Sequence, residues 1–166
     1  FTIGLPEKCI KAGIYNFKGV QRRFSHLFDY NNISFYDDYA HHPTEISSVL
    51  SGVEKVYKNK EIVCVFQPHR ISRVISLKKE FSKCFKKADT VLLCPIYAAN
   101  EKLKLNFTYH SFAKLIIKNS NVRLIQVENE LQLQKFIKQN VFGEKIYIGM
   151  GAGSISNWMK NLKNIF

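Results

Sequence analysis

The sequence predicts an α/β protein with a mostly parallel sheet of about five to six strands and helices on both faces, in a three-layer arrangement. Short apolar runs alternate along the chain with segments whose apolar residues recur at helical spacing, as is typical of parallel strands joined by helices. The apolar runs are continuous, which indicates strands that are buried on both faces. Three of the turns that follow these runs are densely polar or glycine-rich, and ligands bind at such turns in open α/β sheets.

Length and composition indicate one globular domain. The chain has 166 residues, and 46% of them are hydrophobic, which is enough for a core and too many for a disordered chain. Its apolar stretches are too short to span a bilayer, so we expect no membrane insertion. The first residues lack the basic start and apolar core of a signal peptide, and they do not begin with Met. We therefore expect a piece cut from a longer protein.

The formal net charge of +12 favours anionic partners. Only five of the 25 basic residues are Arg, and the lysines are scattered, so a solvated lysine-rich surface is favoured over a nucleic-acid groove. The four cysteines form no Cys-x-x-Cys pair, and Cys64 and Cys94 fall in predicted strands. Buried free thiols in a reducing compartment are therefore expected, and a zinc site is not.

The predicted elements follow one another with short connections. Residues 1–16 form a helical or irregular lead-in, or the tail of a preceding domain, and residues 17–166 form the domain itself. Residues 22–28 and 33–36 are expected to pair like a hairpin across the turn at 29–32. Further strands are predicted at residues 62–66, 90–94, 122–127 and 145–149, and helices at 46–57, 74–85, 112–116, 131–137 and 155–162. The expected fold is Rossmann-like.

The turn after the second predicted strand holds two carboxylates, a phenol and two imidazoles. Asp37 and Asp38 could hold a ribose hydroxyl or a Mg²⁺-bound water, and Tyr39 and His41 offer hydrogen bonds near neutral pH. A capped helix start with incidental histidines is the alternative, but so dense a polar cluster beside a buried strand is costly unless it is used. A metal site at His41 and His42 is not favoured because adjacent side chains diverge.

The turn at residues 67–73 places Arg70 and Arg73 three positions apart, on one face of a helix start. Cations there oppose the helix dipole, and a guanidinium grips a carboxylate or phosphate at two points. The pair therefore suggests an anion held between them, with two ordinary surface arginines as the alternative.

The turn at residues 149–154, GMGAGS, places Gly-x-Gly-x-Gly before a helix. Such a pattern lets backbone N–H groups approach an anion, but the full dinucleotide-binding fingerprint is incomplete. A tight strand-to-helix turn is therefore favoured at least equally. The chain contains no Gly-x-x-x-x-Gly-Lys-Ser/Thr loop, so another domain would have to cradle the β- and γ-phosphates of any bound ATP.

Five motifs span nearly the whole chain: FKGVQRRF (17–24), DDYAHHPTE (37–45), FQPHRISR (66–73), YAA with Glu101 (97–101) and GAG (151–153). In this order they resemble the C-terminal domain of the Mur ligases, which form amide bonds in peptidoglycan synthesis. The HHPTE segment is similar to the members that use L-alanine, and a ligase that recycles murein peptides is the close competitor. Two positions depart from the pattern, with Asn100 and Ser154 replacing the residues usual there.

The resemblance implies one domain of a three-domain cytoplasmic ligase, inactive alone. In such an enzyme ATP phosphorylates the carboxylate of UDP-N-acetylmuramate, and the amine of L-alanine attacks the acyl phosphate. ATP and Mg²⁺ would be bound mainly by a central domain that this chain lacks.

The resemblance also implies roles for single residues. Asp38 and Tyr39 would contact the nucleotide, and Tyr39 and His41 would lie near the amino acid. The alanine carboxylate and the developing negative charge would be held by His69, Arg70 and Arg73, since preorganised cations stabilise such charge. From the residues alone, two other classes stay open: a free-standing nucleotide- or anion-binding module, and a basic nucleic-acid-binding domain.

Overall fold

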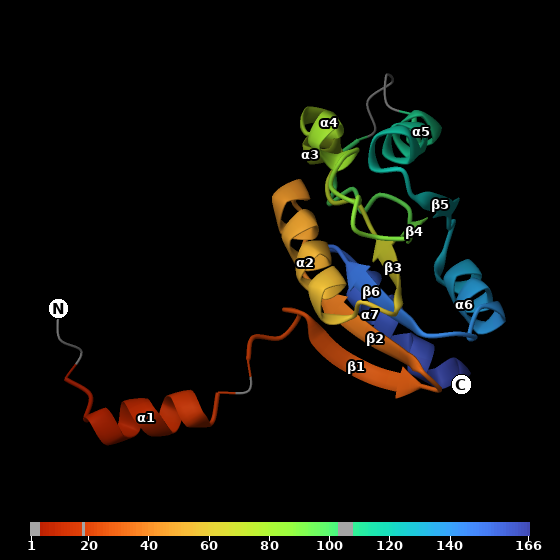
Figure 1. Ribbon diagram of the computed structural model, residues 1–166. Coiled ribbons are helices and arrows are strands. Elements are labelled where there is room, and N and C mark those ends of the chain that lie inside the picture. Colours follow the sequence, from red (N-terminus) through yellow and green to blue (C-terminus); the bar gives the residue numbers. More distant parts are fainter. Residues whose placement is uncertain (1–3, 18, 103–107) are drawn as a thin grey trace.

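The computed structural model describes residues 4–17, 19–102 and 108–166. Residues 1–3 of the predicted lead-in and Lys18 of the first motif lie outside this part. In the described residues, six strands form one sheet in the order β1-β2-β6-β3-β4-β5. The predicted α/β class with a mostly parallel sheet is confirmed (Figure 1).

The strands overlap the segments predicted for them, but the first is displaced along the chain. Residues 22–24 precede it, with positive φ at Arg22 and Phe24, and residues 29 and 30, which were expected in the turn, belong to the strand. The six strands are β1 (Ser25–Tyr30), β2 (Ile33–Asp38), β3 (Glu61–Phe66), β4 (Thr90–Leu93), β5 (Arg123–Gln126) and β6 (Lys145–Met150). β1 and β2 form the predicted antiparallel hairpin, and all the other pairings are parallel. The register pairs both Asp38 and Phe66 with Met150, so β2, β6 and β3 end side by side at one edge of the sheet.

Seven α-helices and a terminal 3₁₀ turn are found in the described residues. They are α1 (Glu7–Tyr15), α2 (Pro43–Val56), α3 (Ile71–Ser76), α4 (Lys78–Phe81), α5 (Tyr109–Ser120), α6 (Glu130–Gln139), α7 (Ile155–Asn161) and η1 (Leu162–Ile165). The prediction of one helix over residues 74–85 is wrong. Leu77 leaves the helical conformation (φ −110°, ψ 27°), which separates α3 from α4. Phe81 and Phe85 are nevertheless fully buried, so their apolar spacing reflects packing without a continuous helix.

Two hydrophobic clusters cover the two faces of the sheet. Alternate residues of β3 divide between them, with Cys64 in the first cluster and Val65 in the second. Side chains of α2, α3, α4 and α5 fill the first cluster, and side chains of α6, α7 and η1 fill the second. The three-layer arrangement is therefore confirmed. Because helices pack on both faces of the sheet, the ends of its strands are held in place and support the candidate site. Cys64, Cys84 and Cys94 are buried free thiols, as predicted for Cys64 and Cys94.

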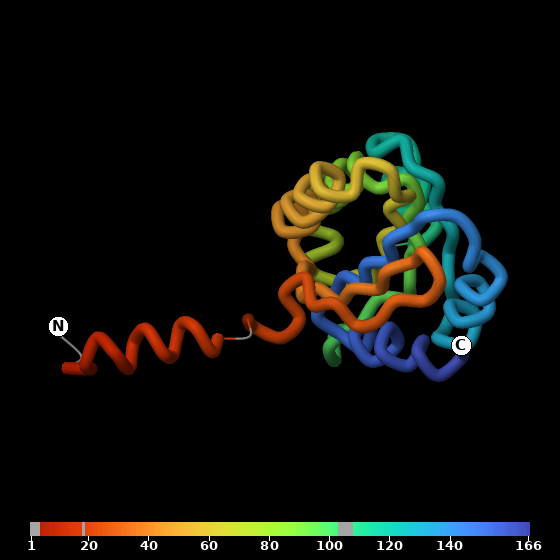
Figure 2. The backbone as a smooth tube through the Cα atoms, turned by 60° about the horizontal axis from the view of Figure 1, so that its bottom comes forward, coloured from red at the N-terminus to blue at the C-terminus, as the bar shows by residue number. Residues whose placement is uncertain are grey.

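The helix α1 lies apart from the sheet and its covering helices in both views (Figures 1 and 2). None of its residues is buried, and Ile14 and Tyr15 are largely exposed. Of the two forms left open for the lead-in, helical or irregular, residues 7–15 adopt the helical one. Within the described residues, no helix is both long enough and apolar enough to cross a membrane.

Candidate functional site

The three turns singled out in the sequence meet at one edge of the sheet. They follow β2, β3 and β6, and β6 lies between the other two strands in the sheet. We call them the first loop (residues 39–42), the second loop (67–70) and the third loop (151–154). The loop after β4 joins them, because the backbone at His69 bridges to Tyr97. The expectation that these turns open on the same edge is therefore confirmed.

A capping box built from the HHPTE segment holds the start of α2. His42 is the N-cap, and its Nδ1 accepts a hydrogen bond from the amide of Thr44 at 3.4 Å. Oε2 of Glu45 accepts hydrogen bonds from the amides of His41 (3.0 Å) and His42 (3.2 Å). Pro43 fills the first helical turn, where no amide hydrogen is needed. His42 and Glu45 thus shape the loop, while the ring of His41 faces the other loops.

Asp38 is 3% exposed, and the protein itself uses both of its carboxylate oxygens. Oδ1 accepts from the amide of Ala40 and Oδ2 from the amide of Phe24, each at 2.7 Å. Hydrogen bonds to a carboxylate are among the stronger ones in proteins. Asp38, at the end of β2, therefore anchors the backbone of the first loop at Ala40. Its direct contact with a nucleotide stays a prediction.

Arg22 connects the first loop to the third. Its Nη2 donates to the carbonyl oxygen of Gly151 at 2.6 Å, and its Nε lies 3.5 Å from Oδ2 of Asp37. The same Asp37 oxygen accepts from the hydroxyl of Ser156 at 2.6 Å, and Asp37 is only 1% exposed. The guanidinium carbon lies 4.6 Å from the ring centre of Tyr39. The sequence prediction gave Arg22 no role, because its Gly151 partner is 129 positions away.

A series of aromatic rings crosses the loops and brings four predicted or motif residues together. Tyr39 and His41 meet edge to face with ring centres 5.0 Å apart, and His41 and His69 do so at 5.9 Å. His69 stacks on Tyr97 at 5.6 Å with an angle of 18° between the ring planes. We call these four residues the ring series. Tyr39 and Tyr97, at its two ends, are 37% and 43% exposed, so both can be reached by a ligand.

His69 and Arg73 form one unit. Nη1 of Arg73 donates to the carbonyl oxygen of His69 at 2.8 Å and lies 3.3 Å from its Nδ1. Burial lowers the pKa of His69, and the positive charge of Arg73 lowers it further. His69 is therefore mainly neutral at pH 7, so it can accept or donate a hydrogen bond but is not a third cation.

Arg70 presents an exposed guanidinium on a fixed support. Its side chain is 54% exposed, and its Nε lies 3.2 Å from Oε1 of Glu101. Glu101 also accepts from the amide and the hydroxyl of Ser72, both at 2.7 Å, and these bonds lower the pKa of its carboxyl group. Arg70 and Arg73 thus turn to different neighbours. The anion predicted between them stays a prediction, and Arg70 is the more exposed of the two.

The glycines of the third loop allow close packing. Gly151 has φ +151°, and a Cβ there would lie 2.7 Å from the carbonyl oxygen of Gln67. A Cβ at Gly153 would lie 2.6 Å from Cγ of Tyr97. The side-chain oxygen of Gln67 accepts from the amide of Ile155 at 3.0 Å, at the start of α7. These contacts favour the tight strand-to-helix turn over the phosphate loop, and they identify Gln67 as a residue that the sequence reasoning missed.

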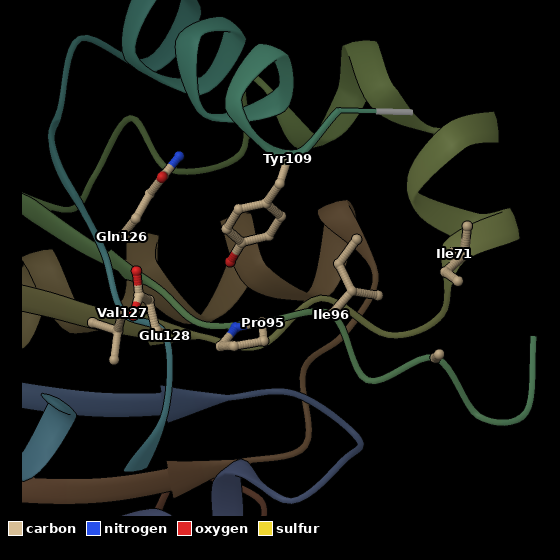
Figure 3. Close-up of a pocket in the computed structure, with 8 residues that line it drawn as sticks. Ile71, Pro95, Ile96, Tyr109, Gln126, Val127 and Glu128 are labelled. Carbon is tan, nitrogen blue, oxygen red and sulfur yellow. The ribbon is translucent and has the colours of Figure 1, made fainter. Parts of the chain in front are cut away.

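A cavity of about 550 Å³ opens beside the second loop (Figure 3). In the close-up, Tyr109 projects from α5 toward Pro95 and Ile96, and Ile71 lies at the opposite end from Gln126. The lining of the cavity is mainly apolar, and none of the described residues that line it is a Lys, Arg or His. The described lining of the cavity therefore provides no cation for a carboxylate or phosphate, unlike the loops next to it. In the part of the chain that is described, no group of three His, Cys, Asp or Glu side chains could hold a metal ion.

Comparison with protein families gives one match across most of the chain. Residues 22–149 match the model described as the glutamate ligase domain of Mur ligase. A UDP-N-acetylmuramate–L-alanine ligase of Pelagibacter ubique is 61% identical over 164 residues, which cover 99% of this chain and 35% of that protein. The enzyme of the same name from Brachyspira hyodysenteriae is 41% identical over 155 residues, covering 92% and 33%. The chain thus spans about a third of the length of these relatives.

Solved structures agree with this match. A UDP-N-acetylmuramate–alanine ligase from Thermotoga maritima superimposes with a TM-score of 0.65 at 29% identity, over 89% of this chain and 30% of that one. A murein peptide ligase from Psychrobacter arcticus gives a TM-score of 0.72 at 20% identity, covering 98% and 33%, which shows the shared fold alone. The family resemblance seen in the five motifs is confirmed, and the chain belongs to the Mur ligase family.

Proposed function

We propose that this chain is the C-terminal domain of an ATP-dependent ligase that joins L-alanine to UDP-N-acetylmuramate. The domain supplies the amino-acid site and part of the nucleotide contact, and it is inactive alone. The observation that carries the proposal is the meeting of Arg70, Arg73 and the ring series at one sheet edge. The chain is also 61% identical to a protein named UDP-N-acetylmuramate–L-alanine ligase.

The second loop fits an amino-acid carboxylate. A guanidinium binds a carboxylate with two parallel hydrogen bonds, and Arg70 is exposed while Glu101 fixes its Nε side. Arg73 adds positive charge next to His69, where the negative charge on an acyl-phosphate oxygen would grow. The neutral ring of His69 and the nearby ring of His41 are suited to contact the amino group of L-alanine.

The first loop fits the nucleotide. Tyr39 has an exposed ring, and a planar base or a ribose can pack against such a ring. In this proposal Asp38 acts on the nucleotide through the loop that it anchors, since both of its oxygens accept amide hydrogen bonds.

The phosphates of ATP and the Mg²⁺ ion are assigned to another domain of the same protein. The third loop is filled by its own contacts with Gln67 and Tyr97, and no phosphate-binding loop motif occurs in the chain. Residues 1–16 are proposed as the tail of that preceding domain and residues 17–166 as the C-terminal domain. Because it would use ATP and a UDP-sugar, the enzyme is proposed to be cytoplasmic.

The function is tested with the full-length protein that contains this chain. Phosphate release is measured with ATP, Mg²⁺, UDP-N-acetylmuramate and L-alanine, and each component is omitted in turn. We expect release only in the complete mixture, and none from the 166-residue chain. Release that requires a murein tripeptide in place of L-alanine would identify a recycling ligase. Nucleotide binding without any turnover in the full-length protein would identify a binding module.

A further inference from the structure

We propose that Arg22 is a positioning residue that holds the ring of Tyr39 for its ligand and couples the first loop to the third. This inference rests on the proposed function for the identity of the ligand, the nucleotide. The contact between Arg22 and Tyr39 is independent of that function.

The side chain of Arg22 reaches three separate parts of the site. It donates to the carbonyl oxygen of Gly151 at 2.6 Å, faces Asp37 at 3.5 Å and covers the ring of Tyr39 at 4.6 Å. Asp37 is in turn tied to Ser156 on α7. One guanidinium thus connects the strand end of β2, the third loop and an exposed ligand-facing ring.

The main chain of Arg22 adds a second hold on the same residue. Its carbonyl oxygen accepts a hydrogen bond from the amide of Tyr39 at 2.7 Å. Tyr39 is therefore fixed at its backbone and at its ring by one residue. Because the ring is 37% exposed, it needs such support to keep one orientation in solvent.

The backbone around Arg22 is strained in a way that suits this role. Arg22 has φ 60° and Phe24 has φ 45°, in the left-handed region that residues with a Cβ seldom adopt. The surroundings hold this conformation, since the amide of Phe24 donates to Asp38 and its ring stacks on Tyr36 at 4.3 Å. Strain of this kind collects at ligand clamps and active sites.

The guanidinium of Arg22 also fixes the orientation in which the partly exposed ring of Tyr39 meets its ligand. The guanidinium covers one part of Tyr39, and the edge-to-face contact with His41 fixes another. Loss of the guanidinium would let the ring turn away from the nucleotide while the buried strand ends stay in place. The expected effect is therefore a weaker nucleotide affinity with a smaller change in turnover.

The first experiment compares Arg22→Met, Arg22→Lys and Arg123→Met in the full-length protein. Arg123 is the matched control, because it is exposed and begins β5 at the opposite edge of the sheet. We expect Arg22→Met to raise the KM for ATP about tenfold, the scale of a lost cation–π contact with its hydrogen bond. Arg22→Lys should recover part of this loss, and Arg123→Met should match the wild type.

A double-mutant cycle then asks whether Arg22 acts through Tyr39. In a Tyr39→Leu background, Arg22→Met should change the KM for ATP by less than about twofold, because the ring it positions is already gone. An equal factor in both backgrounds would overturn the inference. So would a variant whose melting temperature and kcat fall while the KM for ATP is unchanged, since a merely structural role predicts that result.

A measurement on the full-length protein that does not depend on turnover separates this inference from the proposed function. The ring-proton NMR signals of Tyr39 are compared in wild type, Arg22→Met and Arg123→Met. We expect a shift only in Arg22→Met, and unchanged Tyr39 signals in that variant would overturn the contact. If the full-length protein has no ligase activity, the proposed function fails, and the NMR result still decides whether Arg22 positions Tyr39.

Discussion

The imidazole rings of His41 and His69 lie edge to face, with centres 5.9 Å apart and an angle of 87° between their planes. They come from different loops, since His41 follows β2 and His69 follows β3. Between these two strands lies β6, so the contact passes over the end of the central strand. The two loops are therefore joined at the point where the amino acid is proposed to bind.

His69 should titrate below the ordinary histidine pKa. Burial disfavours the charged ring, and Arg73, His41 and Arg70 add to the effect. We expect the NMR titration of its ring protons to have a midpoint below about 6.5. On lowering the pH, His69 is protonated in the unfolded chain before it is protonated in the folded protein. Protonation therefore favours unfolding, and His69 should lower the free energy of unfolding as the pH falls below about 6.5.

A charge-removing variant tests the cause of this shift. Arg73→Leu should move the pKa of His69 upward, toward its ordinary value, while Arg123→Leu should leave it in place. A midpoint in Arg73→Leu identical to that of the wild type would contradict the assigned contribution of Arg73.

Glu45 should stabilise the start of α2 in a pH-dependent way. Burial alone raises the pKa of its carboxyl group, but the amides of His41 and His42 and the charge of His41 outweigh this and lower it. The stabilisation is thus fully present above the unfolded pKa of about 4.5 and lost as the pH falls through the folded value. Glu45→Ala should cost about 1 kcal/mol at pH 7, the usual worth of a cap, and less in acid.

Urea unfolding at pH 7 and at acid pH measures this difference. Glu54→Ala is the control, because Glu54 lies on the same helix with an exposed ion pair to Lys87. Equal losses for Glu45→Ala at both pH values would argue against a role for the carboxylate in the cap.

Two glycine substitutions should have opposite effects. Gly153→Ala would place a Cβ 2.6 Å from Cγ of Tyr97 and should destabilise the fold by about 1–3 kcal/mol through overpacking. It should also disturb the stacking of Tyr97 on His69. Gly52→Ala lies within α2, with nothing within 4 Å of the new Cβ, and should stabilise by about 0.5–1 kcal/mol. Thermal unfolding of both variants checks the pair, and a stabilised Gly153→Ala would show that the third loop is loosely packed.

Local pattern was sufficient to predict the sheet. The central strands β3, β4 and β6 are runs of mostly apolar residues, and burial on both faces requires such runs. The edge strands β1 and β5 are more polar and partly exposed. The convergence of the three loops followed from the parallel direction of the strands alone. The break at Leu77 could not be predicted, because Val74, Phe81 and Phe85 are all buried at helical spacing although the helix is interrupted at Leu77 and α4 ends at Phe81.

The internal contacts of the site could not be read from the sequence. Asp37 and Asp38 look like ligands in the sequence, yet both are buried and bonded to the chain. Gln67 and Arg22 act through partners that lie 88 and 129 positions away. Such partners become visible only when the strand order is known, since periodicity carries no information on which loops meet.

The central claim is that Arg70 binds the carboxylate of the incoming amino acid. Its most direct test is the KM for L-alanine in the full-length protein, measured for wild type, Arg70→Ala and the control Arg123→Ala. We expect Arg70→Ala to raise this KM about tenfold or more, the scale of a lost charge-assisted hydrogen bond, with the KM for UDP-N-acetylmuramate unchanged. An unchanged KM for L-alanine together with an unchanged kcat would contradict the account.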